Sequence, residues 1–186
     1  DDRASAPPLE LPRKPAVGLE LEIEATALSP QGLGRAILEV AVGPQRSLRR
    51  YAVDVRGLLP GERGRVRVLG VKRRQLIARL EELLLADERR QEPRCAHFGA
   101  LDGAGRGCGG CALQHLDHQA QVKLKVEQVA RLFEAAGLDP ALLREPLAPH
   151  DPWYYRNKME YSFAVGKEGE LCLGLHPPGY RHEVLP

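Results

Sequence analysis

The sequence predicts an α+β protein: a small five-stranded β-barrel of the OB type, followed by an α+β domain that is cut short at its C-terminal end. The first half of the chain holds short strand patterns separated by glycine and proline turns. The second half holds a cysteine loop, one helical pattern and one hairpin pattern. With 186 residues, of which 43% are hydrophobic, the chain can bury two small cores. We therefore expect a disordered tail over 1–15, the barrel over 16–82 and the second domain over 83–186.

The strand patterns of the barrel begin at Leu19, where apolar and charged residues alternate through Ala25 and predict a strand with one buried face. Further strands are predicted over 36–42, 50–55, 65–69 and 74–80. Five short strands favour a closed barrel, because closure removes exposed sheet edges, and OB-type barrels often bind oligonucleotides on one face. An SH3-like barrel or another compact sheet is the alternative. Residues 1–15 contain four prolines among small and charged residues, which predicts disorder.

The second domain is predicted to follow a linker over 83–93 and to contain one long helix. Asp117 is placed to cap this helix, which runs to about Ala136, and Gly137 suits the left-handed position after its end. The apolar stripe expected to face a core consists of Val122, Val126, Val129 and Phe133.

Two smaller elements are predicted after the helix. Asp139 and Pro140 are typical of the start of a short second helix. Apolar residues then alternate over 159–165 and 171–175 on either side of a glycine-containing turn, which predicts a β-hairpin. Cys172 takes part in this alternation, so we interpret it as a packed strand cysteine.

Charge is unevenly distributed along the chain, although the formal net charge is only +2. Between Pro44 and Arg79, eleven basic residues accompany two acidic ones, which gives the segment a net charge of +9. Acidic residues flank it, so we expect one basic and one acidic face. The basic face favours phosphate binding over the alternative of a merely solvated surface. The candidate contacts are Arg49, Arg50, Arg65, Arg67, Lys72, Arg73 and Arg74. A second candidate patch consists of Tyr154, Tyr155, Arg156 and Lys158, with inward packing of part of it as the alternative.

The run Cys108-Gly-Gly-Cys111, with Cys95 upstream, predicts a metal centre. Thiolates two apart on a glycine turn can point at one centre while backbone N–H groups face the sulfurs. The uneven cysteine spacing does not resemble a disulfide framework, and a CxxC pair in a reducing compartment more often holds a metal, so we expect a cytoplasmic protein. An iron–sulfur cluster and a zinc ion both fit, the zinc ion with His97 or His115 as its fourth ligand.

Several other functions are not favoured. The longest apolar run, 83–86, is far too short to cross a membrane. The glycine-rich stretches lack the flanking residues of phosphate-binding or dinucleotide-binding loops. None of the six histidines belongs to a recognisable catalytic set, so no catalytic residue is assigned.

Four features together resemble the RNA uracil-C5 methyltransferases that contain a TRAM domain and an iron–sulfur cluster. These are the basic five-stranded segment, Cys95 with Cys108-Gly-Gly-Cys-Ala-Leu-Gln-His-Leu116, Tyr155-Arg-Asn-Lys-Met-Glu-Tyr-Ser-Phe163, and Gly174-Leu-His with His182-Glu-Val-Leu185. The resemblance covers roughly 17–186. The Cys-Gly-Gly-Cys and Tyr-Arg-Asn-Lys blocks are far more specific than a CxxC pair alone.

The resemblance implies a TRAM barrel that grips rRNA or tRNA rather than DNA, and a central domain that holds a 4Fe–4S cluster through Cys95, Cys108 and Cys111. It also implies a Rossmann-like domain that binds S-adenosylmethionine, which is absent from these residues. In the family a cysteine thiolate adds to C6 of uracil, C5 takes the methyl group, and a base removes the C5 proton. None of those groups maps onto this sequence.

The family's fourth cluster cysteine follows a segment that resembles His182-Glu-Val-Leu185, and it would therefore come after Pro186. The loop between Cys95 and Cys108 holds twelve residues, more than is usual in the family, and we interpret Ala100–Gly107 as an insertion that bulges outward. The alternative to an enzyme portion, which would be inactive alone, is a free-standing RNA-binding module that holds zinc or a cluster without catalysis.

Overall fold

The computed structural model describes residues 8–99, 107–166, 168–178 and 184–185. The chain divides into two compact units between Glu88 and Arg89, and each unit is described by itself. Most of the predicted insertion at Ala100–Gly107, the first residues of the predicted tail and part of the segment around His182 lie outside the described residues. Among the helices of the described residues, none is long and apolar enough to span a membrane.

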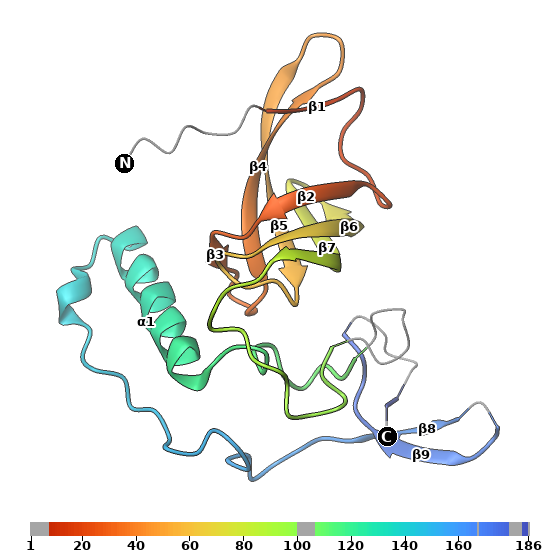
Figure 1. The fold of residues 1–186 in the computed structure, drawn as a ribbon, viewed down its shortest axis with the longest axis vertical. Coiled ribbons are helices and arrows are strands. Elements are labelled where there is room, and N and C mark those ends of the chain that lie inside the picture. Colours follow the sequence, from red (N-terminus) through yellow and green to blue (C-terminus); the bar gives the residue numbers. More distant parts are fainter. Residues whose placement is uncertain (1–7, 100–106, 167, 179–183, 186) are drawn as a thin grey trace. The chain divides into compact units, whose positions relative to one another are not determined.

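The first unit is a curled, mixed β-sheet that forms a half-barrel (Figure 1). Its strands follow the order β1-β4-β5-β7-β6-β2, with β3 paired to β4. The β1–β4 and β5–β7 pairs are parallel and the remaining pairs are antiparallel. The strands are β1 (Leu9–Leu11), β2 (Glu20–Glu24), β3 (Ala27–Leu28), β4 (Gly34–Val42), β5 (Ser47–Arg56), β6 (Arg63–Lys72) and β7 (Gln75–Leu85).

The five predicted strands are all present, as β2 and β4–β7. Two strands were not predicted, and one of them corrects the prediction of a disordered tail: β1 lies within 1–15, where Leu9 and Leu11 are half-buried and pair with β4. Its three residues alternate apolar and charged, but the surrounding prolines obscure so short a pattern. Strand β7 also continues to Leu85, into the stretch predicted to be a linker.

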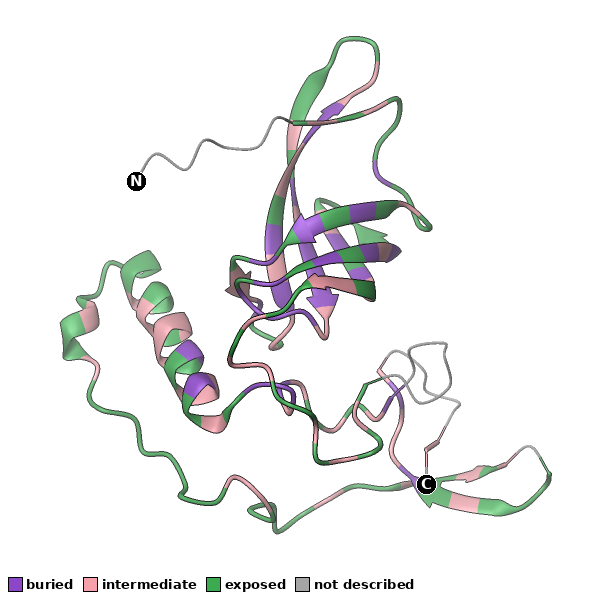
Figure 2. Ribbon diagram, in the orientation of Figure 1, coloured by how far each residue is buried: buried purple, intermediate pink, exposed green. Residues whose placement is uncertain are grey.

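The core of the first unit consists of apolar side chains from alternate positions of its strands, shown as the buried positions in Figure 2. Val40, Val53 and Val66 are fully buried in it. Gly34 allows the loop after β5 to pack against β4, because a Cβ there would come within 2.2 Å of the Leu58 carbonyl oxygen. This close packing holds the strand ends together at one end of the sheet.

A buried ion pair links three strands of the first unit. Asp54 on β5 is 1% exposed, and both of its carboxylate oxygens accept hydrogen bonds from Arg35 on β4, at 2.6 and 2.8 Å. Gln75 on β7 donates a further hydrogen bond to Asp54 at 2.7 Å. The hydrogen bond to Asp54 raises the pKa of the Arg35 guanidinium. The carboxylate of Asp54 therefore joins the strands from within the sheet and is not a surface charge.

Within its described residues, the second unit contains one helix, one 3₁₀ turn and one hairpin, all of which were predicted. Helix α1 spans His118–Ala135, and the carboxylate of Asp117 accepts a hydrogen bond from the Ala120 amide at 3.0 Å. Gly137 follows it with a φ of 73°. The 3₁₀ turn η1 spans Pro140–Leu142, and β8 (Ser162–Val165) pairs antiparallel with β9 (Leu171–Gly174).

The predicted apolar stripe of the helix is only partly buried, because Val122, Val126 and Phe133 are half-buried. The buried residues of α1 are Ala120 and Leu124, whereas Val129 is 41% exposed. The small core of this unit consists of the first turns of the helix and the segment before it, where Leu116 and His115 are 0% and 2% exposed. The helix is therefore anchored at its N-terminal end.

Candidate functional site

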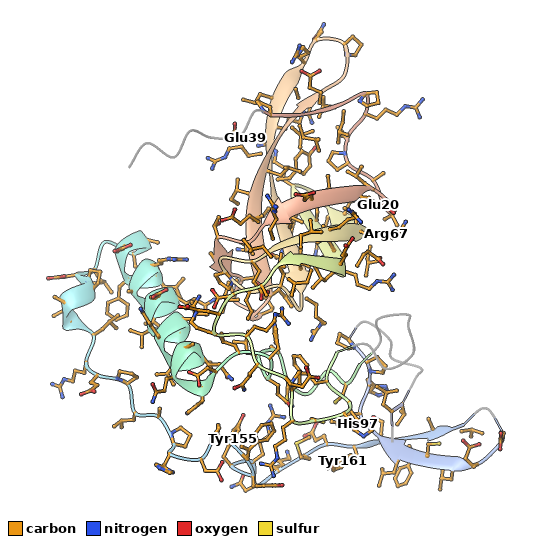
Figure 3. All side chains as sticks on the ribbon, viewed as in Figure 1. Glu20, Glu39, Arg67, His97, Tyr155 and Tyr161 are labelled. Carbon is orange, nitrogen blue, oxygen red and sulfur yellow. The ribbon has the colours of Figure 1, made fainter. Side chains whose placement is uncertain are left out.

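Several candidate arginines of the first unit lie in cross-strand ion pairs. Strands β2 and β6 pair in a register that sets Glu20 opposite Arg67 and Glu22 opposite Arg65. Glu20 and Arg67 lie side by side and form an ion pair (Figure 3). Arg67 also contacts Glu81 at 3.2 Å, and Arg65 pairs with Glu82 on β7. The exposed face of β2, β6 and β7 is thus a ladder of alternating charges.

This ladder corrects the prediction of separate basic and acidic faces. The glutamates of β2 lie directly beside the arginines of β6, and the ion pair between Arg63 and Glu22, at 3.4 Å, extends the same pattern. The prediction failed because it ignored strand pairing, which brings acidic and basic segments that are far apart in the sequence next to one another. The arginines on this face are therefore largely neutralised by carboxylates within the protein.

The basic cluster that lacks such partners lies where β6 turns into β7. Lys72, Arg73 and Arg74, which we call the basic turn, are exposed, and in the described part of the chain no carboxylate pairs with them. Arg73 has a φ of 55°, in the left-handed region. The Arg74 carbonyl oxygen accepts a hydrogen bond from the Ala52 amide of β5 at 2.9 Å. The turn is therefore held beside β5.

Strand β5 contributes two more candidates next to the basic turn. Arg49 and Arg50 precede Ala52 by three and two residues. Arg50 lies 3.7 Å from Glu39 of β4, which is a longer separation than in the ion pairs of the charge ladder. Arg49 has no carboxylate within ion-pair distance in the described ranges. These side chains and the basic turn lie at the same end of the sheet. At this end, the fewest positive charges are paired with carboxylates.

Sequence reasoning overlooked Arg56 at the opposite end of β5. Burial lowers the pKa of its guanidinium, which is half-buried, and the register pairs it with Arg79 of β7. The sequence did contain an indication of this burial, because Arg56 is the last residue of an apolar strand. A basic residue there cannot extend as freely into solvent as the residues of a turn.

In the second unit, backbone hydrogen bonds join the two parts of the cysteine loop. The Cys108 amide donates to the His97 carbonyl oxygen at 2.8 Å, which brings the Cys95 segment to the Cys-Gly-Gly-Cys run. The Cys95 amide donates to the side-chain oxygen of Gln114 at 3.2 Å. The Gly110 amide donates to Cys108 Sγ at 3.3 Å. This last contact is the N–H-to-sulfur arrangement that stabilises a thiolate.

The glycines of this loop are in close contact with the segment that follows the hairpin. A Cβ at Gly109 would lie 2.9 Å from the His176 carbonyl oxygen, and one at Gly110 would lie 3.5 Å from a methyl group of Leu175. Leu175 in turn exchanges two backbone hydrogen bonds with Leu185. Glycine is therefore required at position 109, whereas a Cβ at position 110 would make ordinary van der Waals contacts.

The three predicted thiol ligands have free Sγ atoms, and Cys111 is exposed while Cys95 and Cys108 are partly exposed. Across the described ranges, the side chains of His, Cys, Asp and Glu do not gather in groups of three or more at metal-binding distances. The backbone thus brings the two loop segments together, but the thiols are not assembled into a ligand set. Their chemistry, with a glycine turn and an N–H directed at sulfur, still fits a thiolate-bound cluster.

The histidines considered as zinc ligands differ in their surroundings. The ring of His115 lies inside the small core, tilted against Phe98 with ring centroids 5.1 Å apart. His97 is exposed on the cysteine loop (Figure 3). Cys172 lies in β9 opposite Ala164, and desolvation together with Glu170 raises the pKa of its thiol, which disfavours the thiolate that a metal requires.

The remaining candidates, Arg156 and Lys158, lie on an exposed segment before β8. Lys158 pairs with Glu160 at 3.0 Å, so its charge is partly compensated. Arg156 contacts the sulfur of Met159 at 3.6 Å. The segment also contains aromatic residues whose contacts the sequence did not predict.

Comparison with known proteins gives a consistent set of relatives, although no protein-family model matches the chain. An uncharacterized RNA methyltransferase of Caldanaerobacter subterraneus is 36% identical over 134 residues, which are 72% of this chain and 28% of the relative. The 23S rRNA (uracil(1939)-C(5))-methyltransferase RlmD of Bordetella parapertussis is 40% identical over 125 residues, 66% of this chain and 25% of the relative. The RlmD protein of Bordetella avium is 35% identical over 159 residues, 84% of this chain and 29% of the relative.

The chain spans less than a third of the length of these relatives. The match nevertheless extends over most of the chain itself, at 35 to 40% identity. The family resemblance seen in the sequence motifs is thereby confirmed. Over the part of its length that aligns, the chain is similar to proteins named RNA methyltransferases, among them the 23S rRNA uracil-C5 methyltransferases RlmD.

Proposed function

We propose that the chain is the RNA-binding and 4Fe–4S-binding portion of a cytoplasmic, S-adenosylmethionine-dependent RNA uracil-C5 methyltransferase. In this proposal the first unit is the TRAM barrel and the second unit is the cluster-binding domain. The observation that carries it is the 40% identity to RlmD across 125 residues, together with a cysteine loop and a basic turn in the described structure. In this proposal, the groups for S-adenosylmethionine binding and catalysis lie in a part of the enzyme that this chain does not span.

The basic turn supports RNA binding because its charges are exposed and uncompensated. Cations that already pair with carboxylates must lose those pairs to bind phosphate, whereas the basic turn loses nothing. We therefore rank Arg73 and Arg74 ahead of Arg65 and Arg67 as phosphate contacts. Tyr51 is 3% exposed, so it offers no ring for base stacking. The first unit then holds RNA through phosphates rather than bases.

The cysteine loop supports cluster binding through the thiolates of Cys95, Cys108 and Cys111. The N–H of Gly110 and the side chain of Gln114 hold two of these residues in place by hydrogen bonds. Methyl transfer from S-adenosylmethionine moves no net electrons, so the role of the cluster is architectural. Leu185 forms backbone hydrogen bonds with Leu175, and the side chain of Leu175 lies next to Gly110. A fourth cysteine shortly after Leu185 would therefore lie close to the cysteine loop.

RNA binding is tested by two matched triple variants that remove the same number of charges. We expect Lys72→Gln/Arg73→Gln/Arg74→Gln to weaken binding of a 23S rRNA fragment about tenfold and to reduce the salt slope of log K by about 2, because phosphate contacts release counterions. Arg63→Gln/Arg65→Gln/Arg67→Gln, whose charges are paired, should change the slope by less than about 1. Fluorescence anisotropy at several salt concentrations measures both.

Equal slopes for the two variants would refute the basic turn as the phosphate-binding surface. Failure of the unaltered chain to bind the fragment at low salt would refute RNA binding itself. Methyl transfer is tested separately, by incubating the full-length protein with unmodified 23S rRNA and S-adenosylmethionine. Formation of 5-methyluridine is the expected result, and its absence from a cluster-containing protein would contradict the enzyme assignment.

A further inference from the structure

Three consecutive aromatic residues lie on the surface of the second unit. They are Trp153, Tyr154 and Tyr155, in the extended segment that precedes β8, where Tyr155 is labelled in Figure 3. Tyr154 is 85% exposed and Tyr155 is 69% exposed. Tyrosine rings this exposed lose the stabilisation that burial would give them, and an exposed aromatic cluster often marks a binding surface.

Arg94 organises two of these rings. Its guanidinium carbon lies 5.0 Å from the ring centroid of Trp153 and 5.5 Å from that of Tyr154, within the range of cation–π attraction. It also donates a hydrogen bond to the Tyr154 hydroxyl oxygen at 3.2 Å. Arg94 directly precedes Cys95, so the aromatic segment is fastened to the start of the cysteine loop.

The backbone of this segment is held in an unusual conformation. Tyr154 has a φ of 56°, in the left-handed region that residues with a Cβ rarely adopt. The Trp153 amide donates to the Asp151 carboxylate at 2.9 Å, which closes a tight turn before the rings. Strain of this kind persists where surrounding contacts fix it, and it is concentrated at ligand sites. Here it turns the Tyr154 side chain outward.

The charges around the rings are predominantly positive. In the described residues, neither Arg94 nor Arg156 has a carboxylate at ion-pair distance, while Lys158 pairs with Glu160. Exposed rings beside guanidinium groups that pair with no carboxylate of the described residues match a ligand that has both flat apolar faces and negative charge. Unpaired nucleotides have this combination, whereas in a duplex the base faces are stacked on one another.

We propose that Trp153, Tyr154 and Tyr155, with Arg94 and Arg156, form a stacking surface for unpaired bases of the RNA, and we call it the aromatic platform. This inference rests on the proposed RNA-binding function and adds the form of RNA that the second unit recognises. The basic turn of the first unit grips phosphates of any sequence, and the aromatic platform holds nucleotides that have left the helix. The two surfaces therefore differ in the chemistry of their contacts.

The test uses the fluorescence of Trp153, which is the only tryptophan in the chain. The probes are a single-stranded oligouridylate of about twelve nucleotides, within the usual range of site sizes, and an RNA duplex of the same length. We expect the single strand to quench Trp153 emission. The Tyr154→Leu/Tyr155→Leu variant should bind the single strand about tenfold more weakly, with an unchanged salt slope. Tyr155→Phe, which keeps the ring, should bind like the unaltered chain.

Tyr161→Leu is the matched control, because Tyr161 is 56% exposed on the same segment but has no cation–π contact among those of the described residues. Affinity of the double leucine variant equal to that of Tyr161→Leu would overturn the aromatic platform. So would quenching by the duplex as strong as quenching by the single strand. If the basic-turn variant still loses affinity in those cases, RNA binding by the first unit stands and only the platform is wrong. If neither probe binds the unaltered chain, both proposals fail.

Discussion

The two units differ in how much of their apolar surface they bury for themselves. The first unit closes a core of thirteen buried side chains between its strands. In the described part of the second unit, four apolar side chains are buried, and the hairpin leaves Phe163 and Leu171 69% and 73% exposed. The first unit is therefore built to be stable from its own packing, whereas the second is organised around the cysteine loop.

This contrast indicates where a bound cluster would change stability. Ligands that bind only the folded state stabilise the part of the structure that holds them. We expect cluster binding to stabilise the second unit and to leave the first unchanged. Each unit should also depend on the contacts assigned to it above.

The largest effect is expected in the first unit, for Asp54→Ala. This change leaves Arg35 without the carboxylate that accepts its two hydrogen bonds, and removal of one partner of a buried pair costs about 3 to 5 kcal/mol. Urea unfolding of the first unit measures the loss. Glu39→Ala is the control, because its pair with Arg50 is exposed and should be worth less than about 1 kcal/mol. Equal losses for the two variants would contradict the role given to Asp54.

Leu116→Ala should destabilise the second unit alone. Leu116 is fully buried in the small core, and truncation of a buried leucine costs about 3 kcal/mol. Hydrogen exchange should show faster exchange in α1 and unchanged protection in β4 and β5. Leu147→Ala, at a fully exposed position of the same unit, should change neither. Loss of protection in β4 and β5 would contradict the independence of the two cores.

Gly109→Ala should loosen the contact between the cysteine loop and the hairpin segment. The added methyl group would lie 2.9 Å from the His176 carbonyl oxygen, an overpacking that costs about 1 to 2 kcal/mol. The exchange rate of the Leu175 amide reports the effect, because that amide bonds to Leu185. Gly110→Ala meets its neighbours at 3.4 Å or more and serves as the control. An unchanged exchange rate of the Leu175 amide in the Gly109→Ala variant would contradict this contact.

The smallest effect is expected for Glu81→Gln in the charge ladder. A hydrogen bond from Arg79, supported by Arg67, lowers the pKa of Glu81 below its ordinary value of 4.5. A lowered pKa in the folded state means that Glu81 contributes stability above pH 4.5 and loses this contribution as the pH falls through its folded value. The variant should cost about 0.5 kcal/mol at neutral pH, and the cost should decrease as the pH falls below the ordinary pKa of the carboxyl group. A cost that does not change with pH would show that the charge of Glu81 contributes nothing.

Local patterns in the sequence predicted most of the elements. Strands β2 and β4–β7, helix α1 with its Asp117 cap, and the hairpin β8–β9 follow from alternation, helical spacing and turn residues. Strand β1 was missed because three residues are too few to establish the alternation of apolar and polar positions that identifies a strand. The apolar face of α1 was assigned wrongly because burial depends on what packs against a helix, which its own sequence does not contain.

The site was harder to predict because it depends on contacts between distant residues. The neutralisation of Arg67 by Glu20 requires the register of β2 on β6, across 47 positions of sequence. The cation–π contacts of Arg94 join residues about 60 positions apart. The glycine requirement at Gly109 also arises from a distant residue, because a Cβ there would meet the carbonyl oxygen of His176, although the Cys-Gly-Gly-Cys motif itself was visible in the sequence.

The most direct test of the cysteine loop's assigned role is the iron and acid-labile sulfide content of protein purified without oxygen. We expect both elements in the unaltered chain and in Cys172→Ser, and neither in Cys108→Ser/Cys111→Ser. We also expect the cluster to raise exchange protection in the second unit without changing β4 and β5. A colourless protein that holds one zinc ion and no sulfide would contradict the proposal that this loop binds an iron–sulfur cluster.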